Sequence, residues 1–515
     1  EQPGEQPGEQ PGEQPGDQPG EQPGEQPGVQ PGEQPGEQPG EQPGEQPGEQ
    51  PGEQPGEQPG EQPGEQPGEQ PGEQPGEQPG EQPGEQPGEQ PGEQPGEQPG
   101  EQPGEQPGQN TGNPADMVPG LIEDLLENAI DEPTPNIQVA VEAINQIAVE
   151  ASTEAEIELV DKLGKALYGI GNSGLSPKET KEALKQLFGE SLVNVTSSVS
   201  ATVVKTQEVI LNRLDRIREI QSAGSPPPSA GSGDELNRIW VGGFGIWAKE
   251  DASATVSGYD FSGGGVVLGY DREVDSVPGL RFGIAGSYAS GRVKNNEART
   301  TVDLSTVGIG VYGSYLLPNN VFFDANVSYA STKSDYSTNL YVGGVKTGTF
   351  HINAWQFGLR AGYVFEGDNF QIIPSVGIRY TLLSQGAFAD TLDAAALDNT
   401  VANAYRAKTD HQVDIPVQIR FNATFGSGSV KITPELRLGY NFAVKKLDNS
   451  MNVGFVGSNR TFKINGTRPR GNSFQAGFGL KVSAGGKLEA FVNYDLEVSK
   501  RYRSHAASVG LGFTF

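Results

Sequence analysis

The chain closes with Ser504-His-Ala-Ala-Ser-Val-Gly-Leu-Gly-Phe-Thr-Phe515, and this stretch decides the fold. Its apolar side chains Val509, Leu511, Phe513 and Phe515 alternate with glycine and threonine, which is the period of a strand with one apolar face. A soluble protein rarely ends on such an exposed strand. A closed outer-membrane barrel does, because its last strand pairs with its first and faces lipid. The pattern favours the barrel over the alternative, an edge strand of a soluble sandwich.

The same alternation recurs upstream, in residues 412–425, 431–445 and 487–498. One face of each stretch is apolar, and the other face carries charged and amide side chains. Strands of ten or more residues with charges on one face suit a tilted crossing of ~25 Å of hydrocarbon around a wet lumen. The side chains that we expect to face this lumen are Arg420, Glu435, Arg437, Glu489, Asp495 and Glu497.

The chain from residue 238 to 515 is predicted to be an all-β transmembrane barrel of twelve antiparallel strands. The strands are expected at about 239–249, 258–271, 280–293, 301–316, 320–333, 352–366, 369–383, 411–425, 429–445, 472–483, 486–499 and 504–515. Such a barrel needs no edge strand, because the first and last strands pair.

Short and long connections alternate between these strands, which is typical of barrels with brief periplasmic turns and longer outer loops. Tight turns are expected at 317–320, 367–369, 426–429 and 484–487. Long polar loops are expected at 334–351, 384–410 and 446–471. Aromatic residues beside the short turns, Tyr315, Phe323, Phe365 and Phe370, fit an interfacial girdle.

Residues 1–108 repeat the tetrapeptide Glu-Gln-Pro-Gly, with departures only at Asp17 and Val29. The repeat holds 25 Glu and one Asp without Lys or Arg, so it contributes −26 of the net charge of −32. With proline at every fourth position and almost no apolar side chain, it cannot bury a core. We expect a disordered, extended tail of polyproline-II and turn conformers that reaches at most ~300 Å.

A helical junction region is predicted for 109–190, between the repeat and the barrel. Helices are expected at about 117–130, 137–150, 154–169 and 177–189. Two of them begin with a capping box, Thr153 with Glu156 and Ser176 with Glu179. A small bundle of amphipathic helices is the simplest interpretation.

Residues 191–221 are predicted to form a helix that spans the pore. The first half is rich in Ser, Thr and Val, which suits a narrow polar channel, and the second half carries Arg213, Arg216 and Arg218 near its end. Thirty helical residues extend ~45 Å, enough to cross a barrel. A linker rich in Pro, Gly and Ser, 222–237, then leads into the barrel. The alternative, an exposed coiled coil, lacks a sustained apolar heptad.

Several stretches together resemble the translocator end of autotransporters, the type V secretion proteins. They are Ala183-Leu-Lys-Gln-Leu-Phe-Gly-Glu190, Leu211-Asn-Arg-Leu-Asp-Arg-Ile-Arg218, Trp240-Val-Gly-Gly-Phe-Gly-Ile-Trp247, Gly258-Tyr-Asp-Phe-Ser-Gly-Gly-Gly-Val-Val-Leu-Gly-Tyr-Asp271 and the closing strand. The resemblance covers about 183–515. It implies a twelve-stranded barrel, a helix threaded through its pore and an upstream passenger carried to the cell surface.

The resemblance also implies partners and a place in the cell. The barrel is expected in the Gram-negative outer membrane, in contact with its lipid, after a signal peptide upstream of Glu1 has directed export. The barrel-assembly machinery and periplasmic chaperones are expected partners, and the machinery would read Leu511, Phe513 and Phe515. The repeat matches no passenger motif of the family, so a host or surface ligand is not inherited.

Two functions of different classes remain open. The first is a translocator that displays its own acidic repeat on the cell surface, as an adhesin or stalk. The second is a structural or pore-forming membrane protein with a periplasmic Pro-rich tail. We expect no enzymatic activity, no cofactor and no nucleic-acid partner. The histidines, His351, His411 and His505, sit at strand ends, and the chain has no cysteine, so we expect no metal site.

The last expectation concerns anchoring. Some autotransporters cleave between two adjacent asparagines in the pore helix, but Asn194 and Asn212 are far apart here. We therefore expect the passenger to stay attached. The three pore-helix arginines are expected to face the acidic wall residues Glu489, Asp495 and Glu497.

Overall fold

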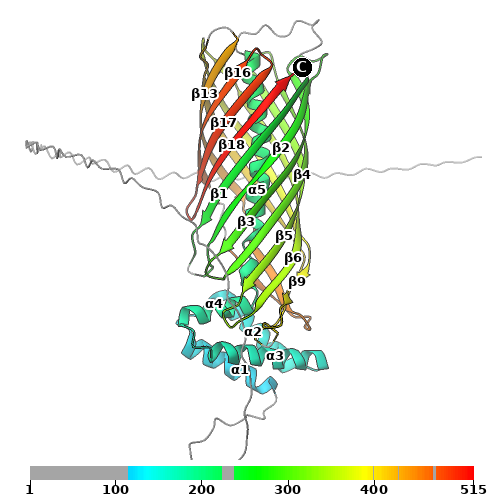
Figure 1. Cartoon of the computed structure of the whole chain (residues 1–515), viewed down its shortest axis with the longest axis vertical. Coiled ribbons are helices and arrows are strands. Elements are labelled where there is room, and N and C mark those ends of the chain that lie inside the picture. Colours follow the sequence, from blue (N-terminus) through cyan, green and yellow to red (C-terminus); the bar gives the residue numbers. More distant parts are fainter. Residues whose placement is uncertain (1–113, 223–236, 254, 398, 427–428, 468–470) are drawn as a thin grey trace, which may run out of the picture. The chain divides into compact units, whose positions relative to one another are not determined.

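The computed structural model describes residues 114–222, 237–253, 255–397, 399–426, 429–467 and 471–515. The expectations for the repeat, 1–108, and for nearly all of the linker, 222–237, lie outside these residues. The described part consists of a β-barrel, a helix inside it and a group of helices at one of its ends (Figure 1).

Twelve antiparallel strands form the barrel wall, as the sequence predicts. They are β1 (Asn237–Glu250), β2 (Tyr259–Glu273), β3 (Leu280–Asn295), β4 (Thr300–Leu316), β5 (Val321–Asn339), β6 (Val345–Tyr363), β8 (Phe370–Gln385), β12 (Lys408–Ala423), β13 (Val430–Lys445), β16 (Ser473–Ala484), β17 (Leu488–Val498) and β18 (Tyr502–Thr514). Pairing of β1 with β18 and of β6 with β8 closes the wall, so no edge strand of the barrel is left unpaired among the described residues. The two-residue strand β7 (Phe365–Glu366) extends β6 at its end.

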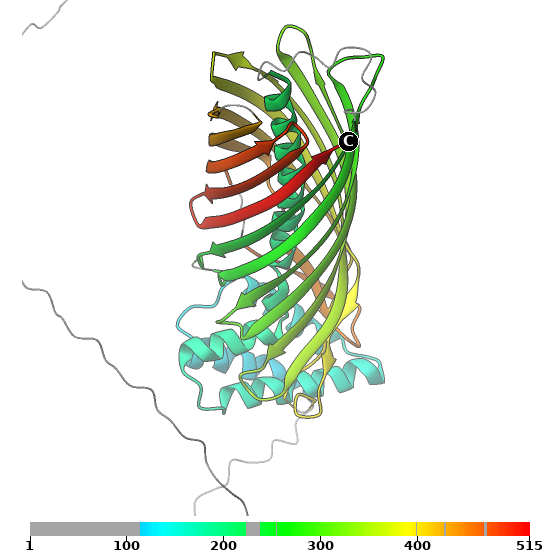
Figure 2. The ribbon, with the colours of Figure 1, turned by 45° about the horizontal axis from the view of Figure 1, so that its top comes forward.

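The connections define two ends of the barrel. The short-turn end carries the turns 317–320, 367–369 and 485–487, together with the carboxy-terminus. The loop end carries the connections from β8 to β12 and from β13 to β16, and the helices lie there (Figures 1 and 2). Exposed Phe323, Phe365 and Phe370 lie beside the turns of the short-turn end, in the positions expected of an aromatic girdle.

The long polar loop expected at 334–351 is wrong, because most of it is strand. β5 continues to Asn339 and β6 begins at Val345, so the connection is only the turn 340–344. The period of two persists through this stretch, but the polarity of its two faces is exchanged. On β6, the outward side chains are apolar near the short-turn end, at Phe357 and Leu359, and polar nearer the loop end, at His351. The inward side chains change in the opposite sense, from Gln356 to Ile352.

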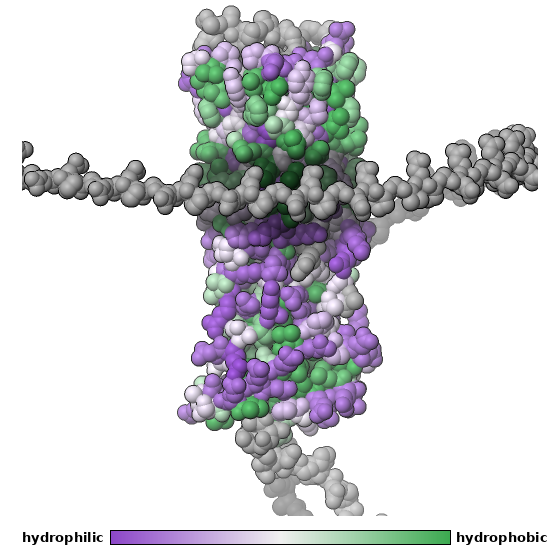
Figure 3. Space-filling view, turned by 180° about the vertical axis from the view of Figure 1, so that it is seen from behind, coloured by the Kyte–Doolittle hydropathy of each residue, from purple (hydrophilic) through white to green (hydrophobic). Residues whose placement is uncertain are grey.

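This exchange divides the barrel into two zones. Near the short-turn end the outer wall is apolar and the lumen polar, as lipid requires. Towards the loop end the outer wall is polar and the interior apolar, as in a water-soluble barrel. Figure 3 shows the apolar surface gathered over the half near the short turns and hydrophilic surface over the other half.

The two remaining long connections are folded and are not irregular loops. Residues 384–410 contain β9 (Phe388–Ala389), β10 (Thr391–Leu392) and β11 (Asn403–Tyr405). Residues 446–471 contain β14 (Ser450–Phe455) and β15 (Thr461–Asn465). Four of these strands pair in the order β15-β14-β11-β9 into a small sheet at the loop end.

Four helices pack at the loop end, close to the predicted positions. They are α1 (Pro114–Asp124), which continues as the π-helical turn η1 (Leu125–Ala129), α2 (Pro135–Glu150), α3 (Glu154–Gly171) and α4 (Pro177–Leu187). Both predicted capping boxes, at Thr153 and Ser176, are present. The helices share one hydrophobic core with the small sheet and with the interior of the barrel, through residues such as Leu163, Leu184, Phe455 and Ile352.

The short 3-10 turn η2 (Glu190–Leu192) joins α4 to α5 (Val195–Ser222), which runs inside the barrel towards the short-turn end (Figure 2). The expectation that the first half of this helix lies in a polar channel is wrong for its valines. Val195, Val199 and Val203 belong to the same apolar core as Ile246 and Ile352 of the wall. Within the described residues, no helix is both long and apolar enough to cross a membrane.

Candidate functional site

The second half of α5 lies among the charged side chains of the lumen. One face of this half is apolar, and Val209, Leu214 and Ile217 pack with Trp240 and Tyr312 of the wall. Trp240 Nε1 donates a hydrogen bond to Tyr312 Oη at 2.8 Å. The other faces of the helix carry the ionisable residues from Lys205 to Arg218. This arrangement fixes the rotation of the helix, because only one orientation buries the apolar face against Trp240.

Asp215 of α5 is the centre of the first ion network. Its carboxylate is fully buried and contacts three guanidinium groups, those of Arg218, Arg360 and Arg420. Arg360 Nη2 lies 2.7 Å from Asp215 Oδ1. Because Arg218 belongs to α5, Arg360 to β6 and Arg420 to β12, this one carboxylate ties the helix to two strands of the wall.

Asp324 of β5 extends this network on one side. Arg218 Nη1 donates to Asp324 Oδ1 at 2.7 Å, and Arg360 Nη2 lies 2.6 Å from Asp324 Oδ2. The guanidinium of Arg218 also stacks over the ring of Phe322, 3.9 Å from its centroid. Arg218 is therefore held by charge and by stacking, and its side chain is buried.

On the other side the network continues through β12, β13 and β17 and returns to the helix. Arg420 Nη1 donates to Glu435 Oε2 at 2.7 Å, and Arg437 contacts Glu435 and donates to Asp495 Oδ1 at 2.7 Å. Asp495 Oδ2 accepts a 2.6 Å hydrogen bond from Lys205 Nζ of α5. The alternation of positive and negative groups is unbroken from Asp324 to Lys205.

A second network surrounds Arg213. Arg213 Nε lies 3.2 Å from Asp271 Oδ2, and its Nη1 contacts Glu489. Arg281 shares the same aspartate, with Nη1 2.9 Å from Asp271 Oδ1. Arg216 lies 3.8 Å from Glu489 and stacks over a phenylalanine of β17, with its guanidinium carbon 3.5 Å from the ring centroid. This network joins α5 to β2, β3 and β17.

Of the three acidic residues predicted to face the arginines of α5, only one does so. Glu489 contacts Arg213 and Arg216, but Asp495 pairs with Lys205 and Arg437. Glu497 accepts a hydrogen bond from Ser473 Oγ at 2.8 Å and lines the cavity described below. Which acidic residue pairs with which cation depends on the depth of the helix in the barrel and on its rotation. The signs of the charges in the sequence do not determine either quantity.

Sequence reasoning missed several members of the site, above all Asp215, Lys205 and Asp271. One signal for Asp215 was present. In Leu211-Asn-Arg-Leu-Asp-Arg-Ile-Arg218, arginines stand on both sides of Asp215 in the sequence. A carboxylate in such a place would need further cations from other strands or helices only if it were buried, because a buried charge must be compensated. No pattern in the sequence predicts that burial.

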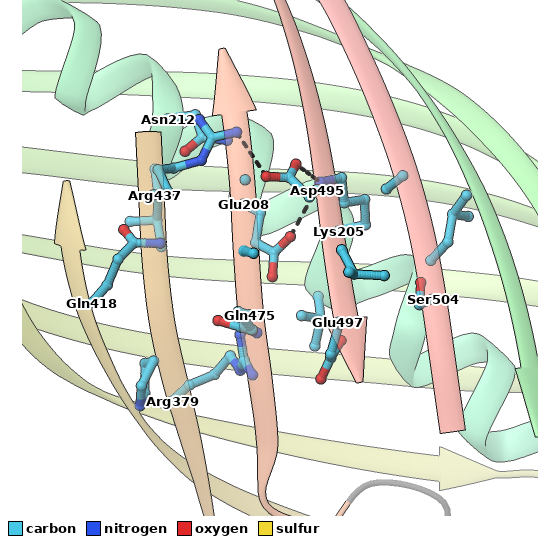
Figure 4. A pocket seen from close by; sticks show the side chains of 18 of the residues that line it. Lys205, Glu208, Asn212, Arg379, Gln418, Arg437, Gln475, Asp495, Glu497 and Ser504 are labelled. Atoms are coloured by element: carbon cyan, nitrogen blue, oxygen red, sulfur yellow. Dashed lines mark hydrogen bonds and ion pairs between the residues drawn. The ribbon is translucent and has the colours of Figure 1, made fainter. Parts of the chain in front are cut away.

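A small cavity of ≈ 120 Å³, lined by both charged and apolar side chains, remains between α5 and the wall. Figure 4 shows Lys205, Glu208 and Asn212 on the helix facing Arg437, Gln475 and Asp495 on the strands, with Lys205 bridging Glu208 and Asp495. A space of this size holds a few water molecules. The helix therefore fills most of the lumen at this level. No group of His, Cys, Asp and Glu in the described part of the chain could hold a metal ion.

At the loop end, side chains of the barrel form hydrogen bonds with the end of α4, just before the chain enters the lumen. Lys346 Nζ donates to Gln186 O at 3.1 Å and to Asn403 Oδ1 at 2.7 Å, while Asn403 Nδ2 donates to Leu187 O at 3.0 Å. These bonds reach carbonyl groups in the last turn of α4, where intrahelical donors run out. Burial lowers the pKa of Lys346, although nearby Asp390 opposes the shift.

Asn194, just before α5, is held by the loops around it. Asn194 Nδ2 donates to Ser257 O at 3.2 Å, and its Oδ1 accepts from Asn449 Nδ2 at 2.9 Å and from Thr467 N at 3.0 Å. Asn212 lies far down the helix and accepts a hydrogen bond from Arg420 Nη2 at 3.1 Å. The two asparagines are separate in space as well as in sequence.

The closing strand completes the wall with an apolar outer face. Leu511, Phe513 and Phe515 are 53%, 50% and 44% exposed, as expected for side chains that face lipid. Leu511 lies opposite Val241 of β1, and Phe513 lies opposite Leu488 of β17. Phe515 N donates to Asn237 O at 2.9 Å, so the terminal residue still bonds to the first strand.

Comparison with protein families finds a match over the barrel. The model described as "Autotransporter beta-domain" matches residues 239–495, which begin in β1 and end in β17. The match thus covers eleven of the twelve strands of the wall, and β18 follows it. A β-domain of this kind is a translocator with no enzymatic role of its own, and the Gram-negative outer membrane is its location.

Curated relatives are similar over half of the chain or more. Outer membrane protein B of Rickettsia prowazekii (strain Madrid E) is 24% identical over 359 residues, which cover 64% of this chain and 21% of that protein. Putative uncharacterized protein YaiT of Escherichia coli (strain K12) is 25% identical over 279 residues, covering 54% and 27%. Immunoglobulin A1 protease autotransporter of Haemophilus influenzae is 23% identical over 300 residues, covering 57% and 14%. The chain thus spans about a quarter or less of the length of these relatives.

Among solved structures, the translocator domain of autotransporter NalP from Neisseria meningitidis superposes with a TM-score of 0.45 at 14% identity, covering 60% of this chain and 98% of that domain. The transport unit of the autotransporter AIDA-I from Escherichia coli gives a TM-score of 0.40 at 13% identity, covering 58% and 97%. The family match over the barrel, with twelve strands and an internal helix, leads to one conclusion: this chain is a member of the autotransporter family and carries the family's outer-membrane translocator barrel at its carboxy-terminal end.

Proposed function

We propose that the chain carries its own N-terminal acidic repeat, residues 1–108, to the cell surface and anchors it there. The observation that carries this proposal is the direction of α5. Its amino-terminal end lies at the loop end, where it continues from the folded helices α1–α4, and its other end leads towards β1. In barrels of this class the longer loops lie outside the cell. A segment that precedes α1 is then attached on the outer side.

The surface role that we assign to the repeat is that of a stalk or an adhesive segment. A repeat of Glu-Gln-Pro-Gly cannot bury a core, so it does not compete with the barrel for folding. Its negative charges recur at nearly every fourth residue and repel one another. A chain of this kind can separate whatever precedes it from the membrane, or present the repeat itself to a ligand.

We also propose that α5 remains in the barrel as a plug and holds the passenger. Two ion networks and an apolar face bind the helix to strands on different sides of the wall, through Asp215, Arg213, Arg218 and Lys205. The helix contains no pair of adjacent asparagines. A repeat that serves as a stalk would lose that role if it were released.

Assembly of this barrel is proposed to begin from its last strand. The outward residues Leu511, Phe513 and Phe515 are the part of the strand that the barrel-assembly machinery would recognise, after periplasmic chaperones have kept the chain soluble. The unpaired edges of β1 and β18 must be protected until they meet, because exposed edges promote aggregation.

Protease treatment of intact cells tests the proposed display. An antibody against Glu-Gln-Pro-Gly follows the repeat, and a periplasmic protein serves as the control for membrane integrity. Loss of the repeat from intact cells, with the control protein preserved, supports surface display. Digestion of the repeat only after the outer membrane is opened would instead support the second candidate, a pore or structural protein with a periplasmic tail. Free repeat in the medium, cut within 191–220, would refute the anchoring.

A further inference from the structure

The outward side chains of the wall change from apolar to basic near the turn between β17 and β18. On β18 the outward side chains Val509 and Ala507 give way to His505 and Arg503 towards the loop end. On β1, outward Trp247 is followed by Lys249. Lys500 and Arg501 occupy the turn itself, and both are exposed. We call Lys249, Lys500, Arg501 and Arg503 the basic rim.

The four residues of the basic rim lie together. Lys249 and Arg503 are directly opposite each other on neighbouring strands, with both side chains exposed on the outer face. The turn is tight, since Ser499 N donates to Tyr502 O at 2.8 Å. Asp251 N donates to Arg501 O at 2.9 Å, which places the turn against the end of β1. The backbone therefore holds four cations at one corner of the wall.

This corner lies at the edge of the apolar zone. Trp247 and Tyr494 are 54% and 47% exposed immediately below it, and Tyr494 Oη lies 2.6 Å from His505 Nδ1. Aromatic side chains with a polar tip favour the boundary between acyl chains and headgroups. The strands β16, β17 and β18 have only 12, 11 and 13 residues, whereas β5 and β6 have 19 each and continue to the helices (Figures 1 and 2). The short strands leave the rim open at the level of the headgroups.

Two exposed cations on the neighbouring part of the outer wall are paired with carboxylates. On β3 and β4, Arg292 Nε lies 2.6 Å from Asp303 Oδ1. On β5, Lys333 Nζ lies 2.8 Å from Asp335 Oδ2. In the rim, Lys249 lies 3.9 Å from Asp260.

For the other three cations of the rim, no carboxylate of the described residues lies within the 4.0 Å that defines an ion pair. Asp251 and the buried Glu250 at the end of β1 lie beside Arg501 and offset part of the positive charge, so the excess of the rim is concentrated on the exposed side chains of Lys500 and Arg503.

We propose that the basic rim binds the phosphate groups of a phosphorylated lipid in the leaflet at the loop end. The guanidinium groups of Arg501 and Arg503 offer paired donors that match phosphate oxygens, and the two lysines add point charges. Exposed apolar side chains below the rim, Val492 and Val509 among them, would face the acyl chains of the same lipid. This leaflet is the outer one in the proposed orientation of the barrel, but binding itself does not depend on that orientation.

The experiment uses the purified full-length chain in a neutral detergent and a hexa-acylated diglucosamine lipid with two phosphates. Binding is measured by native mass spectrometry, with the phosphate-free form of the lipid and with inorganic phosphate as separate arms. The triple variant Lys500→Gln, Arg501→Gln, Arg503→Gln is compared with a matched control, Arg292→Gln with Lys333→Gln, which removes two paired cations. Heat-modifiability on gels confirms that each barrel is folded.

Each cation near a charged lipid surface contributes about fivefold in affinity, so the triple variant should bind the phosphorylated lipid about 100-fold more weakly. The single variant Arg503→Gln should bind about fivefold more weakly, and it keeps the test valid if the triple variant does not fold. The control should stay within twofold of the unmodified chain. The proposal would be overturned if the phosphate-free lipid bound as tightly as the phosphorylated lipid, or if inorganic phosphate bound the rim as tightly as that lipid. It would also be overturned if the control variant lost as much affinity as the triple variant.

Discussion

Replacement of Asp215 by alanine tests how firmly the lumen holds α5. The carboxylate is 1% exposed and touches the guanidinium groups of Arg218, Arg360 and Arg420. Removing one partner of a buried ion pair usually costs about 3–5 kcal/mol, because the remaining charge is left uncompensated. Here Arg360 keeps Asp324 as a partner and Arg420 keeps Glu435. We therefore expect a loss near the lower limit, about 3 kcal/mol.

Hydrogen exchange of the α5 amides, followed by mass spectrometry on the full-length chain, measures this loss. A decrease of about 3 kcal/mol in the free energy that holds the helix raises its exchange rate roughly 100-fold. Asp215→Asn keeps the volume and removes the charge, so most of the increase should remain.

Glu208→Ala is the matched control on the same helix. The Glu208 side chain is 30% exposed and has one ion-pair partner, Lys205 at 3.3 Å. Exposed pairs contribute about 0–1 kcal/mol, so exchange should rise less than about fivefold. If Asp215→Ala accelerates exchange no more than Glu208→Ala does, the network around Asp215 does not hold the helix and this reasoning is wrong.

Three further predictions concern assembly, topology and pH. Deletion of Phe515 should leave little heat-modifiable barrel in the outer membrane and a degraded chain in the periplasm, and normal insertion would contradict a role of the last strand in assembly. Epitope tags in the turn 340–344 should be reachable by antibody on intact cells, while tags in 317–320 should not, and the reverse result would invert the topology. Burial raises the pKa of Glu190 to about 7 from an ordinary value near 4.5. The folded state therefore favours the protonated carboxyl, and the stability of the junction between α4 and α5 is highest below about pH 4.5 and falls as the pH rises through 7. After correction for the intrinsic, base-catalysed rate of amide exchange, the protection of this junction should fall by roughly 3 kcal/mol between about pH 4.5 and pH 7 and then level off, and Glu190→Gln should remove that fall.

The barrel was predictable because its signal is repeated in every strand. The alternation of side chains located all twelve strands, and the pairing of β1 with β18 follows from closure. The extension of β5 and β6 was missed for a physical reason. At Lys333 and Asp335 the outward face becomes polar while Tyr336 turns inward, so the period of two continues but no longer looks like a membrane strand. Polar outward residues here mark the point where the strand leaves lipid, and not the start of a loop.

The candidate site was predictable in composition but not in pairing. The sequence indicates that arginines near the end of α5 meet acidic residues on inward strand positions. It does not indicate that Arg218 meets Asp324, because that pair depends on the depth of the helix and its rotation. These are set by the packing of Leu214 and Ile217 against Trp240, which involves residues distant in sequence. Asp215 was missed for the same reason, since its partners come from β6 and β12.

Planar-bilayer conductance tests the central claim, that α5 closes the pore of this translocator. Two chains are compared, one beginning at Ser191 and the other at Ser222, so that they differ by the helix and both lack α1–α4. Without the helix, the half of the lumen near the short turns is lined by inward charges such as Arg420 and Glu435. The account predicts a stable open channel for the shorter chain and a nearly closed one for the longer chain. Equal conductance of the two would contradict it.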